Sequence, residues 1–477
     1  WTETAKKDTS GHPRVQRVRN GLSYWSGPGT HPCEVVHQGS VRTMDPSEAR
    51  LSARDSYLFG FPFVANYRVF IEKAATRGSM LLGKGFNEFA RYRDLIPAGT
   101  PDTPQHDTLY LFAVLDLRRE PMVITVPDVA DGYSYMLQLG DTSTETLPYV
   151  STITTSNRAS RFVLVGPDFQ GLVPSEQFDG VIATRGQFVV VIGRVSIVDP
   201  DDLEPLHEIQ DGIILEPLSE VLGVDRPPDP GSVDFIEYDD ERASGLGVFD
   251  YINHALAWHP PALSELAEMA RFGRIGVVAG EAFNTDSLSS EVVAALEAGI
   301  ADAKTAIAEN VEKFLPMVNG WNWATTDISR FGDDYLARST VALKNIYPNA
   351  PDHAVYGQAF RDVDGNALHG KNRYSITFPE GQTPPVDWFW SLTLYNAETT
   401  SMYPNPTGRT SIGDRTAGLR TAEDGGLTIV IQHDSPIETD NWLPAPDTPI
   451  YLVLRCYGPK AEIVDGTWSP PEIRKLE

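Results

Sequence analysis

The period at which apolar residues recur changes twice along this chain, and that order constrains the fold more than any single motif does. Short β-rich runs separated by turn residues come first, as in Leu109–Leu117 and Gln187–Val198. Between about 248 and 347, apolar residues instead recur every three or four positions, the period of a helix. Strand-like runs then return, as in Trp388–Tyr395 and Ile450–Tyr457. We therefore predict an α+β protein with two β-sandwich, jelly-roll-like domains joined by a helical section.

These changes of period divide the chain into four parts. We predict an N-terminal arm over 1–45, a first domain of helices followed by a β-sandwich over 46–247, a helical section over 248–350, and a C-terminal β-sandwich domain over 351–477. Within the helical section, one apolar stripe runs from Val292 to Phe314 in steps of three or four residues. This stripe predicts a long helix packed against a core.

The first domain is predicted to begin with a helix. Asp45 can cap its first turn, and Pro46 suits the first helical position because a proline lacks the amide proton that is unpaired there anyway. Gly60 and Pro62 are poor residues for a helix interior, so we expect an interruption there before the helix resumes at Phe63.

A weak internal repeat connects the two β-rich parts. Residues 134–146 and 389–401 each form an alternating strand that leads into Asp or Asn and a hydroxyl-rich segment. Later, Phe188–Arg194 resembles Pro449–Arg455, and both runs end in arginine. Two β units of common design would explain the repeat, and chance similarity between β-rich segments is the alternative.

The charge balance excludes several classes of function. Lys and Arg together number 39 against 65 Asp and Glu, which gives a net charge of −26. Such an acidic surface repels phosphate backbones and anionic lipids, so we predict no nucleic-acid or membrane partner. No run approaches the ~20 apolar residues of a membrane-spanning helix. A small-molecule ligand is the expected partner, and the sequence leaves a homo-oligomer open.

Cysteine usage and the first residue bear on localisation. Cys33 and Cys456 are the two cysteines, far apart in sequence, and two free thiols are favoured over one disulfide. The chain begins with Trp1, which a removed signal peptide or a trimmed chain would explain. With the acidity, these features predict a secreted or periplasmic protein.

The common cofactor and metal motifs are missing or incomplete. Gly78–Gly85 resembles a phosphate-binding loop, but its last position is glycine instead of the Ser or Thr that would hold magnesium. Asp362–Asn366 resembles the start of a calcium loop without its terminal Glu, which favours a turn and leaves weak calcium binding open. No Cys or His spacing fits zinc or iron. We predict no cofactor and no tightly bound transition metal.

Candidate catalytic residues lie at the start of one predicted strand. His106, Asp107 and Tyr110 combine an imidazole, a carboxylate and a phenol, which could perform general acid–base chemistry at the mouth of a sandwich. Alternatively, Asp107 accepts bonds from turn amides and Tyr110 packs with its hydroxyl hydrogen-bonded.

Candidate substrate-binding residues gather where aromatic and cationic side chains are densest, together with the strand-ending arginine of the first β part. They are Arg194, Trp390, Tyr395, Arg409, Asn441 and Arg455. Within the predicted strand, alternation places Trp388 and Trp390 on one face and Phe389 and Tyr395 on the other. Such a set could line a small-molecule pocket, or equally form a sandwich core with stacked arginines.

Several runs of the sequence resemble two bacterial families. Asp107–Tyr110, Pro121–Pro127 and Gly132–Leu139 resemble domain of unknown function 1254. Pro384–Tyr395 and Asn441–Pro446 resemble domain of unknown function 1214, which is its companion. The resemblance implies two β-sandwich domains around a helical section, often in exported proteins, and it implies no agreed activity.

Two functions follow from these observations. The first is an exported enzyme, a hydrolase or lyase, that acts on a small organic molecule in a cavity between the β domains. The adjacent His106 and Asp107 favour it. The second is a non-catalytic ligand-binding or assembly protein, favoured because no recognised nucleophile motif is present. Arginines in both β units would then hold an anionic group.

Overall fold

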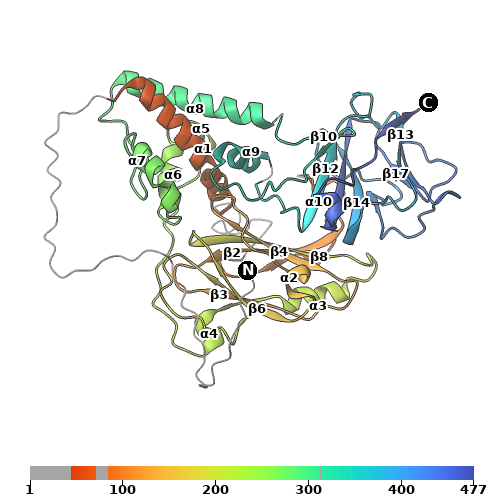
Figure 1. Cartoon of the computed structure of the whole chain (residues 1–477), viewed down its shortest axis with the longest axis horizontal. Coiled ribbons are helices and arrows are strands. Elements are labelled where there is room, and N and C mark those ends of the chain that lie inside the picture. The colour runs from red at the N-terminus through yellow and green to blue at the C-terminus, as the bar shows by residue number, and fades with distance from the viewer. Residues whose placement is uncertain (1–43, 71–83, 102, 312, 345) are drawn as a thin grey trace.

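The chain forms a mixed α+β structure of helices and several sheets. A computed structural model describes residues 44–70, 84–101, 103–311, 313–344 and 346–477. Helices lie at the upper left of Figure 1, above a first β region, and a second β region lies at the right. Residues 1–43 of the predicted arm, which include Cys33, and most of the loop at Gly78–Gly85 lie outside the described residues.

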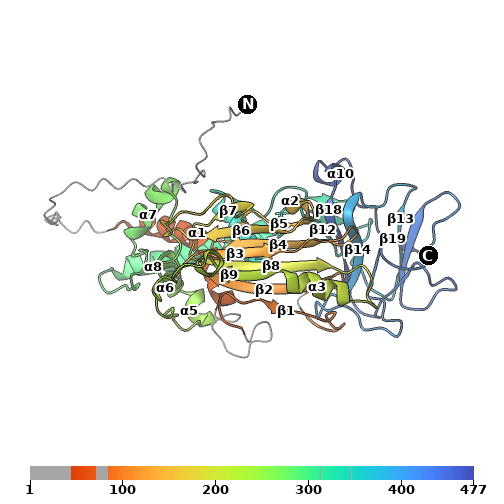
Figure 2. The ribbon, with the colours of Figure 1, turned by 90° about the horizontal axis from the view of Figure 1, so that it is seen from below.

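The first β region contains two sheets. One has the order β1 (Ala90–Arg91), β2 (Thr108–Asp116), β8 (Phe188–Ser196), β4 (Tyr135–Asp141) and β5 (Val150–Ser151). The other has the order β7 (Gly180–Ala183), β6 (Ser160–Val165), β3 (Met122–Val126) and β9 (Ile214–Pro217). Figure 2 shows these two sheets from below, with short helices α2 (Thr152–Thr155) and α3 (Glu204–Gly212) near them, and α4 (Leu218–Leu222) is seen in Figure 1.

Alternation along the strands explains why these two sheets face each other. In β2, Leu109, Leu111 and Leu115 are fully buried and share one cluster with Ile124 and Leu164 of the second sheet. The intervening residues point to the opposite face, as the two-residue period of a strand requires. That opposite face packs against the helical section and the second β region: Val114 and Phe188 share a cluster with Trp258, and Met136 shares one with Phe389.

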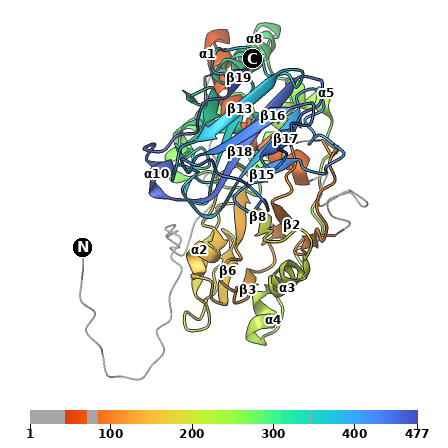
Figure 3. The same cartoon turned by 90° about the vertical axis from the view of Figure 1, so that its right-hand side faces the viewer.

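The second β region repeats this arrangement strand by strand. One sheet has the order β10 (Met317–Val318), β11 (Trp321–Trp323), β12 (Ala354–Ala359), β18 (Ile450–Pro459), β14 (Val386–Asn396) and β15 (Ser411–Gly413). The other has the order β17 (Trp442–Pro444), β16 (Leu427–Gln432), β13 (Arg373–Phe378) and β19 (Arg474–Leu476), and α10 (Ala461–Val464) follows β18. Figure 3 shows β13, β16, β17, β18 and β19 above the strands of the first β region.

The correspondence between the two regions extends to the direction of the strands. The order β2-β8-β4-β5 matches β12-β18-β14-β15, and β7-β6-β3-β9 matches β17-β16-β13-β19. In each region the one parallel pair described is the same pair, β6 with β7 and β16 with β17. The interpretation of the sequence repeat as two β units of common design is therefore confirmed for the described strands. The prediction of a jelly roll stays a prediction.

Helix α1 (Pro46–Phe70) runs without a break, so the predicted interruption at Gly60 and Pro62 is wrong. Pro62 has no amide proton for the carbonyl of Leu58, but the hydroxyl of Ser339 donates to that oxygen at 2.5 Å. Gly60 lies against Ile252, where a Cβ atom would come within 2.3 Å of a side-chain carbon. Tertiary contacts thus compensate for both residues.

The remaining helices pack around α1. They are α5 (Asp240–Ser244), α6 (Val248–Leu256), α7 (Leu266–Gly273) after a 3₁₀ turn at Leu263–Glu265, α8 (Ser290–Val311) and α9 (Tyr335–Lys344). The predicted stripe of α8 is buried from Val292 to Ile307 in the core that α1 shares. Phe314 lies beyond the end of the helix. No described helix is long and apolar enough to cross a membrane.

Two local predictions have clear outcomes in the second β region. A register irregularity in β14 between Val386 and Phe389 turns Trp388 to the Phe389 side, so its predicted place beside Trp390 is wrong. Asp362 accepts hydrogen bonds from the backbone of Asp364 and Asn366, which makes this segment a turn. Cys456 is buried in the core of this region.

Candidate functional site

Two arginines occupy equivalent positions in the two β regions. Arg194 lies on β8 and pairs with Tyr110 of β2 and Met136 of β4. Arg455 lies on β18 and pairs with Tyr356 of β12 and Ser391 of β14. Each arginine therefore sits on a central strand, on the face away from the core of its own region, with a tyrosine on one neighbouring strand.

Arg455 is held by hydroxyl groups of its own sheet. Its guanidinium donates to Thr393 Oγ1 at 2.9 Å and to the Tyr395 hydroxyl at 2.7 Å. The cation also lies 5.6 Å from the Tyr395 ring centre and 5.9 Å from that of Tyr356. Tyr395 in turn donates to the carbonyl of Pro104, in the segment that precedes β2. This contact connects the second β region to the first.

Arg194 is held by amide oxygens and aromatic rings. Its Nη1 donates to Gln138 Oε1 at 3.1 Å and to Asn349 Oδ1 at 3.4 Å, and its cation lies 5.7 Å from the Tyr110 ring centre. Its Nε atom is buried and has no hydrogen-bond partner. No carboxylate in the described part of the chain forms an ion pair with Arg194 or Arg455.

A chain of hydrogen bonds joins the surroundings of the two arginines. The amide of Asn349 donates to the Tyr356 hydroxyl at 2.6 Å, and Tyr356 donates to Tyr457 at 2.8 Å. Gln105 Nε2 donates to Tyr457 at 2.7 Å and to Tyr110 at 3.1 Å. Tyr457 thereby receives bonds from both β regions. We call Arg194, Arg455, Asn349, Tyr356 and Tyr457 the arginine–tyrosine network.

The electrostatics of this network keep the arginines charged and the phenols protonated. Burial alone would lower the pKa of Arg194, but Tyr356, Tyr457 and neighbouring phenols raise it above its ordinary value. Burial likewise opposes the charge of Arg455, and Tyr395 and Asp107 raise its pKa. Burial raises the pKa of Tyr457 far above 10. The network is therefore a stable concentration of positive charge at neutral pH.

A cavity of about 400 Å³ adjoins this network. It lies between the end of α8, helix α9 and the strands β10, β11 and β12, and none of its described lining residues belongs to the first β region, so it is not the predicted cavity between the two β domains. Tyr356 and Asn349 belong both to its wall and to the network. The cavity wall is thus one side chain away from Arg194, through Asn349.

The predicted catalytic residues do not share one partner. Asp107 accepts a hydrogen bond from Ser391 Oγ at 2.8 Å, and His106 Nδ1 lies 3.3 Å from Thr410 Oγ1. Tyr110 instead faces Arg194 and Gln105. Burial lowers the pKa of His106, so its imidazole is neutral at pH 7. None of the three lines the cavity.

The predicted substrate-binding residues fall into two groups. Arg194, Tyr395 and Arg455 belong to the contact between the β regions, as described above. Trp390 packs in the core of the second region beside Phe378. Arg409 donates to backbone carbonyls of 439–442, and Asn441 bonds the backbone at Arg420 and Thr428. Trp390, Arg409 and Asn441 therefore hold parts of the second region together.

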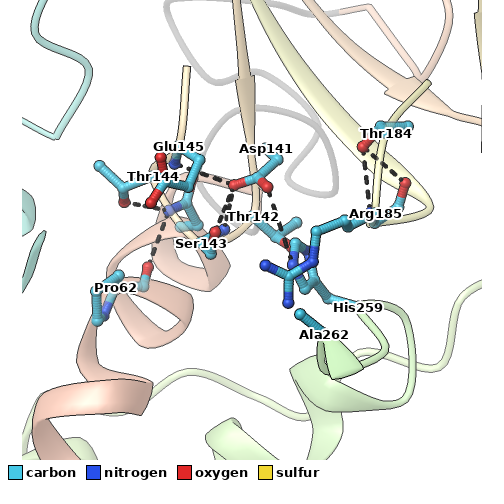
Figure 4. Close-up of polar contacts among 12 residues, drawn as sticks. Pro62, Asp141, Thr142, Ser143, Thr144, Glu145, Thr184, Arg185, His259 and Ala262 are labelled. Atoms are coloured by element: carbon cyan, nitrogen blue, oxygen red, sulfur yellow. Dashed lines mark hydrogen bonds and ion pairs between the residues drawn. The ribbon is translucent and has the colours of Figure 1, made fainter. Parts of the chain in front are cut away.

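A second buried polar centre lies where β4 meets the helices, and Figure 4 shows it. His259 is fully buried, its Nδ1 lies 2.8 Å from the Thr142 hydroxyl, and its Nε2 lies 3.9 Å from Asp141 Oδ2. Burial lowers the pKa of His259 to about 4. The Asp141 carboxylate also accepts bonds from Ser143 and the Glu145 backbone. None of these residues lines the cavity, and their bonds fix the turn after β4.

Sequence reasoning missed several residues of the network and the cavity. Gln105 and Asn349 lie outside the strands and belong to no motif, so their amides carried no signal. Tyr457 belongs to the strand-like run Ile450–Tyr457 and lies two residues after Arg455, so the alternation of side chains on one strand face could have found it. Lys344 is the last residue of α9 and lines the cavity, and only the tertiary fold reveals that position.

Comparison with family models identifies both β regions. Residues 86–217 match a family described as protein of unknown function, DUF1254, and residues 353–461 match another, DUF1214. The chain carries a DUF1254 region followed by a DUF1214 region. This confirms the predicted families and their order. Each matched segment contains one of the two arginines.

A solved structure shares the fold. A crystal structure of the VPA0106 protein from Vibrio parahaemolyticus matches with a TM-score of 0.71 and 24% identity, over 90% of this chain and all of the other. A putative uncharacterized protein from Burkholderia cenocepacia aligns with a TM-score of 0.43 and 13% identity over 90% of this chain and 94% of the other. No curated protein matches the chain.

Proposed function

We propose that this protein binds a small organic molecule in the 400 Å³ cavity beside the arginine–tyrosine network. The observation that carries the proposal is that Tyr356 and Asn349 line the cavity and at the same time bond the network that holds Arg194. Small-molecule sites combine apolar walls with a few fixed polar groups, and their volumes run from about 300 to 1,000 Å³. The cavity meets both conditions.

The polar groups of the wall are held in place before any ligand arrives. Asn349 uses its amide nitrogen for Tyr356, and its oxygen faces Arg194. Tyr356 is fixed further by Tyr457, which is itself buried. Preorganised groups lose little freedom on binding, which favours affinity.

Binding without turnover is favoured over catalysis, because the acid–base side chains of the described wall are Tyr356, whose hydroxyl already donates to Tyr457, and Lys344. Among the described residues that line the cavity there is no histidine, cysteine, aspartate or glutamate. A hydrolase or lyase needs an acid, a base or a nucleophile within hydrogen-bond reach of the bound substrate. The acid–base role of His106 and Asp107 would require a substrate that reaches beyond this cavity.

A variant that fills the cavity tests the proposal. Gln358 is exposed on β12 and lines the cavity, so Gln358→Trp should narrow it without disturbing the core. Ligand-observed NMR with a library of small organic molecules should give hits on the wild type that this variant loses. Thr421→Trp, at an exposed loop position outside the cavity, is the matched control. A wild type without hits, or hits that survive in Gln358→Trp, would overturn the proposal.

A further inference from the structure

The charges around the cavity are opposite in sign to the charge of the protein. The chain carries a net charge of −26, with 65 acidic residues against 39 basic ones. The described residues of the cavity wall nevertheless include two cations, Lys344 and Arg361, and no carboxylate. In a chain this acidic, a cavity wall with two cations and no carboxylate is suited to bind a negatively charged ligand.

Both cations keep donors that are free to meet a ligand. Lys344 closes α9, is exposed, and forms no ion pair with a described carboxylate. Arg361 follows β12, is also exposed, and donates from Nη1 to the carbonyl of Gly365 at 2.9 Å. A guanidinium has five donor hydrogens, so most of them stay available. Lysine and arginine are the usual partners of carboxylates and phosphates.

The rest of the wall is largely apolar. Large apolar side chains come from the end of α8 and the loop after it, from β10, from α9 and from the residue after β12: Val311, Phe314, Leu315, Met317, Val341 and Phe360. Val311 and Phe314 are the last two positions of the apolar stripe that began in α8. Met317 and Phe360 are 63% and 45% exposed, values that are high for such residues and are explained if a ligand covers them.

We propose that the ligand is an amphipathic organic anion, with a carboxylate or similar acidic group at one end and an apolar body. The acidic group would lie toward Lys344 and Arg361, and the apolar body would pack on Phe314 and Val341. Arg194 donates to Asn349, which lines the cavity, and so adds a positive charge behind the wall. This inference rests on the proposed function and adds the chemical class of the ligand to it.

Three probes of equal chain length and different charge test the class. Octanoate, 1-octanol and octylammonium are titrated into the protein by calorimetry at low salt. Octanoate should bind at least tenfold more tightly than 1-octanol, and octylammonium should bind most weakly. Lys344→Gln should weaken octanoate binding about threefold to tenfold, as expected when one charged partner is lost. Lys371→Gln removes the same charge at an exposed position outside the cavity and should change nothing.

The outcomes separate the two proposals. Equal affinity for all three probes, with binding still lost in Gln358→Trp, would overturn the anionic class and keep the binding function. Equal loss of octanoate binding in Lys344→Gln and Lys371→Gln would also overturn it, because the effect would then come from overall charge. Absence of binding by all three probes to a wild type that gives library hits would overturn the inferred class alone, and absence of library hits as well would overturn the binding function.

Discussion

Replacing Arg455 by methionine tests whether this buried arginine holds the second β region together. Arg455 is 5% exposed and donates to Thr393 and Tyr395. Methionine has a similar length and keeps the apolar contacts of the stem, but it has no donors. The Arg455→Met variant should therefore fold and show lower stability, with no change in the way the sheets pack.

The size of the effect follows from the groups that lose a partner. Hydrogen bonds to a charged group contribute about 1.5–3 kcal/mol each. Tyr395 still bonds the Pro104 carbonyl, whereas Thr393 Oγ1 has no other side-chain bond in the described structure. Loss of the charge also removes the desolvation cost of the guanidinium, which offsets part of the loss. We expect the free energy of unfolding to fall by about 2–4 kcal/mol.

Urea unfolding measures this change as a lower midpoint with an unchanged slope. A double-mutant cycle with Tyr395→Phe should give a coupling energy of about 1–3 kcal/mol, since the two side chains bond directly. Trp390 lies on β14, as Tyr395 does, but its side chain is in the core on the opposite face of the sheet. Trp390→Phe is therefore a control that should show little coupling to Arg455→Met. A midpoint equal to or above that of the wild type would refute this account of Arg455.

Two further predictions concern the helical section and the centre around His259. The folded-state pKa of His259 is about 4, below the ordinary 6.5, so the unfolded chain binds more protons between these pH values. The free energy of unfolding should thus fall by up to about 3 kcal/mol as the pH decreases from about 6.5 to 4, and chemical unfolding of His259→Gln should show this decline flattened. Ser339→Ala leaves the Leu58 carbonyl opposite Pro62 unpaired and should cost about 1–3 kcal/mol in thermal unfolding, whereas an unchanged melting temperature would show that the bond contributes nothing.

The order of helices and strands could be predicted because the spacing at which apolar residues recur is a local property of the sequence. The arginines that end Phe188–Arg194 and Pro449–Arg455 were visible for the same reason, and they proved to occupy matching strands. The continuity of α1 could not be predicted. It depends on Ser339, which lies far along the chain and supplies the bond that Pro62 cannot make.

The candidate site was harder to predict because residues in two loops, Gln105 and Asn349, connect its strands. Gln105 and Asn349 act through side-chain amides that any loop position could carry, and only the fold brings them to Tyr457 and Tyr356. The predicted place of the cavity, between the β domains, was wrong, because no described residue of the first β region lines it. Helix α9 and the end of α8 form part of its wall, and the apolar stripe of α8 continues past the helix end to Phe314 in that wall.

The position of a bound anion tests the central claim most directly. A crystal of the protein grown with 8-bromooctanoate would locate the bromine by its anomalous scattering. The account predicts the bromine within the cavity, against Phe314 and Val341, with the carboxylate toward Lys344 and Arg361. Bromine density at another place in the protein, with the cavity free of the probe, would contradict it.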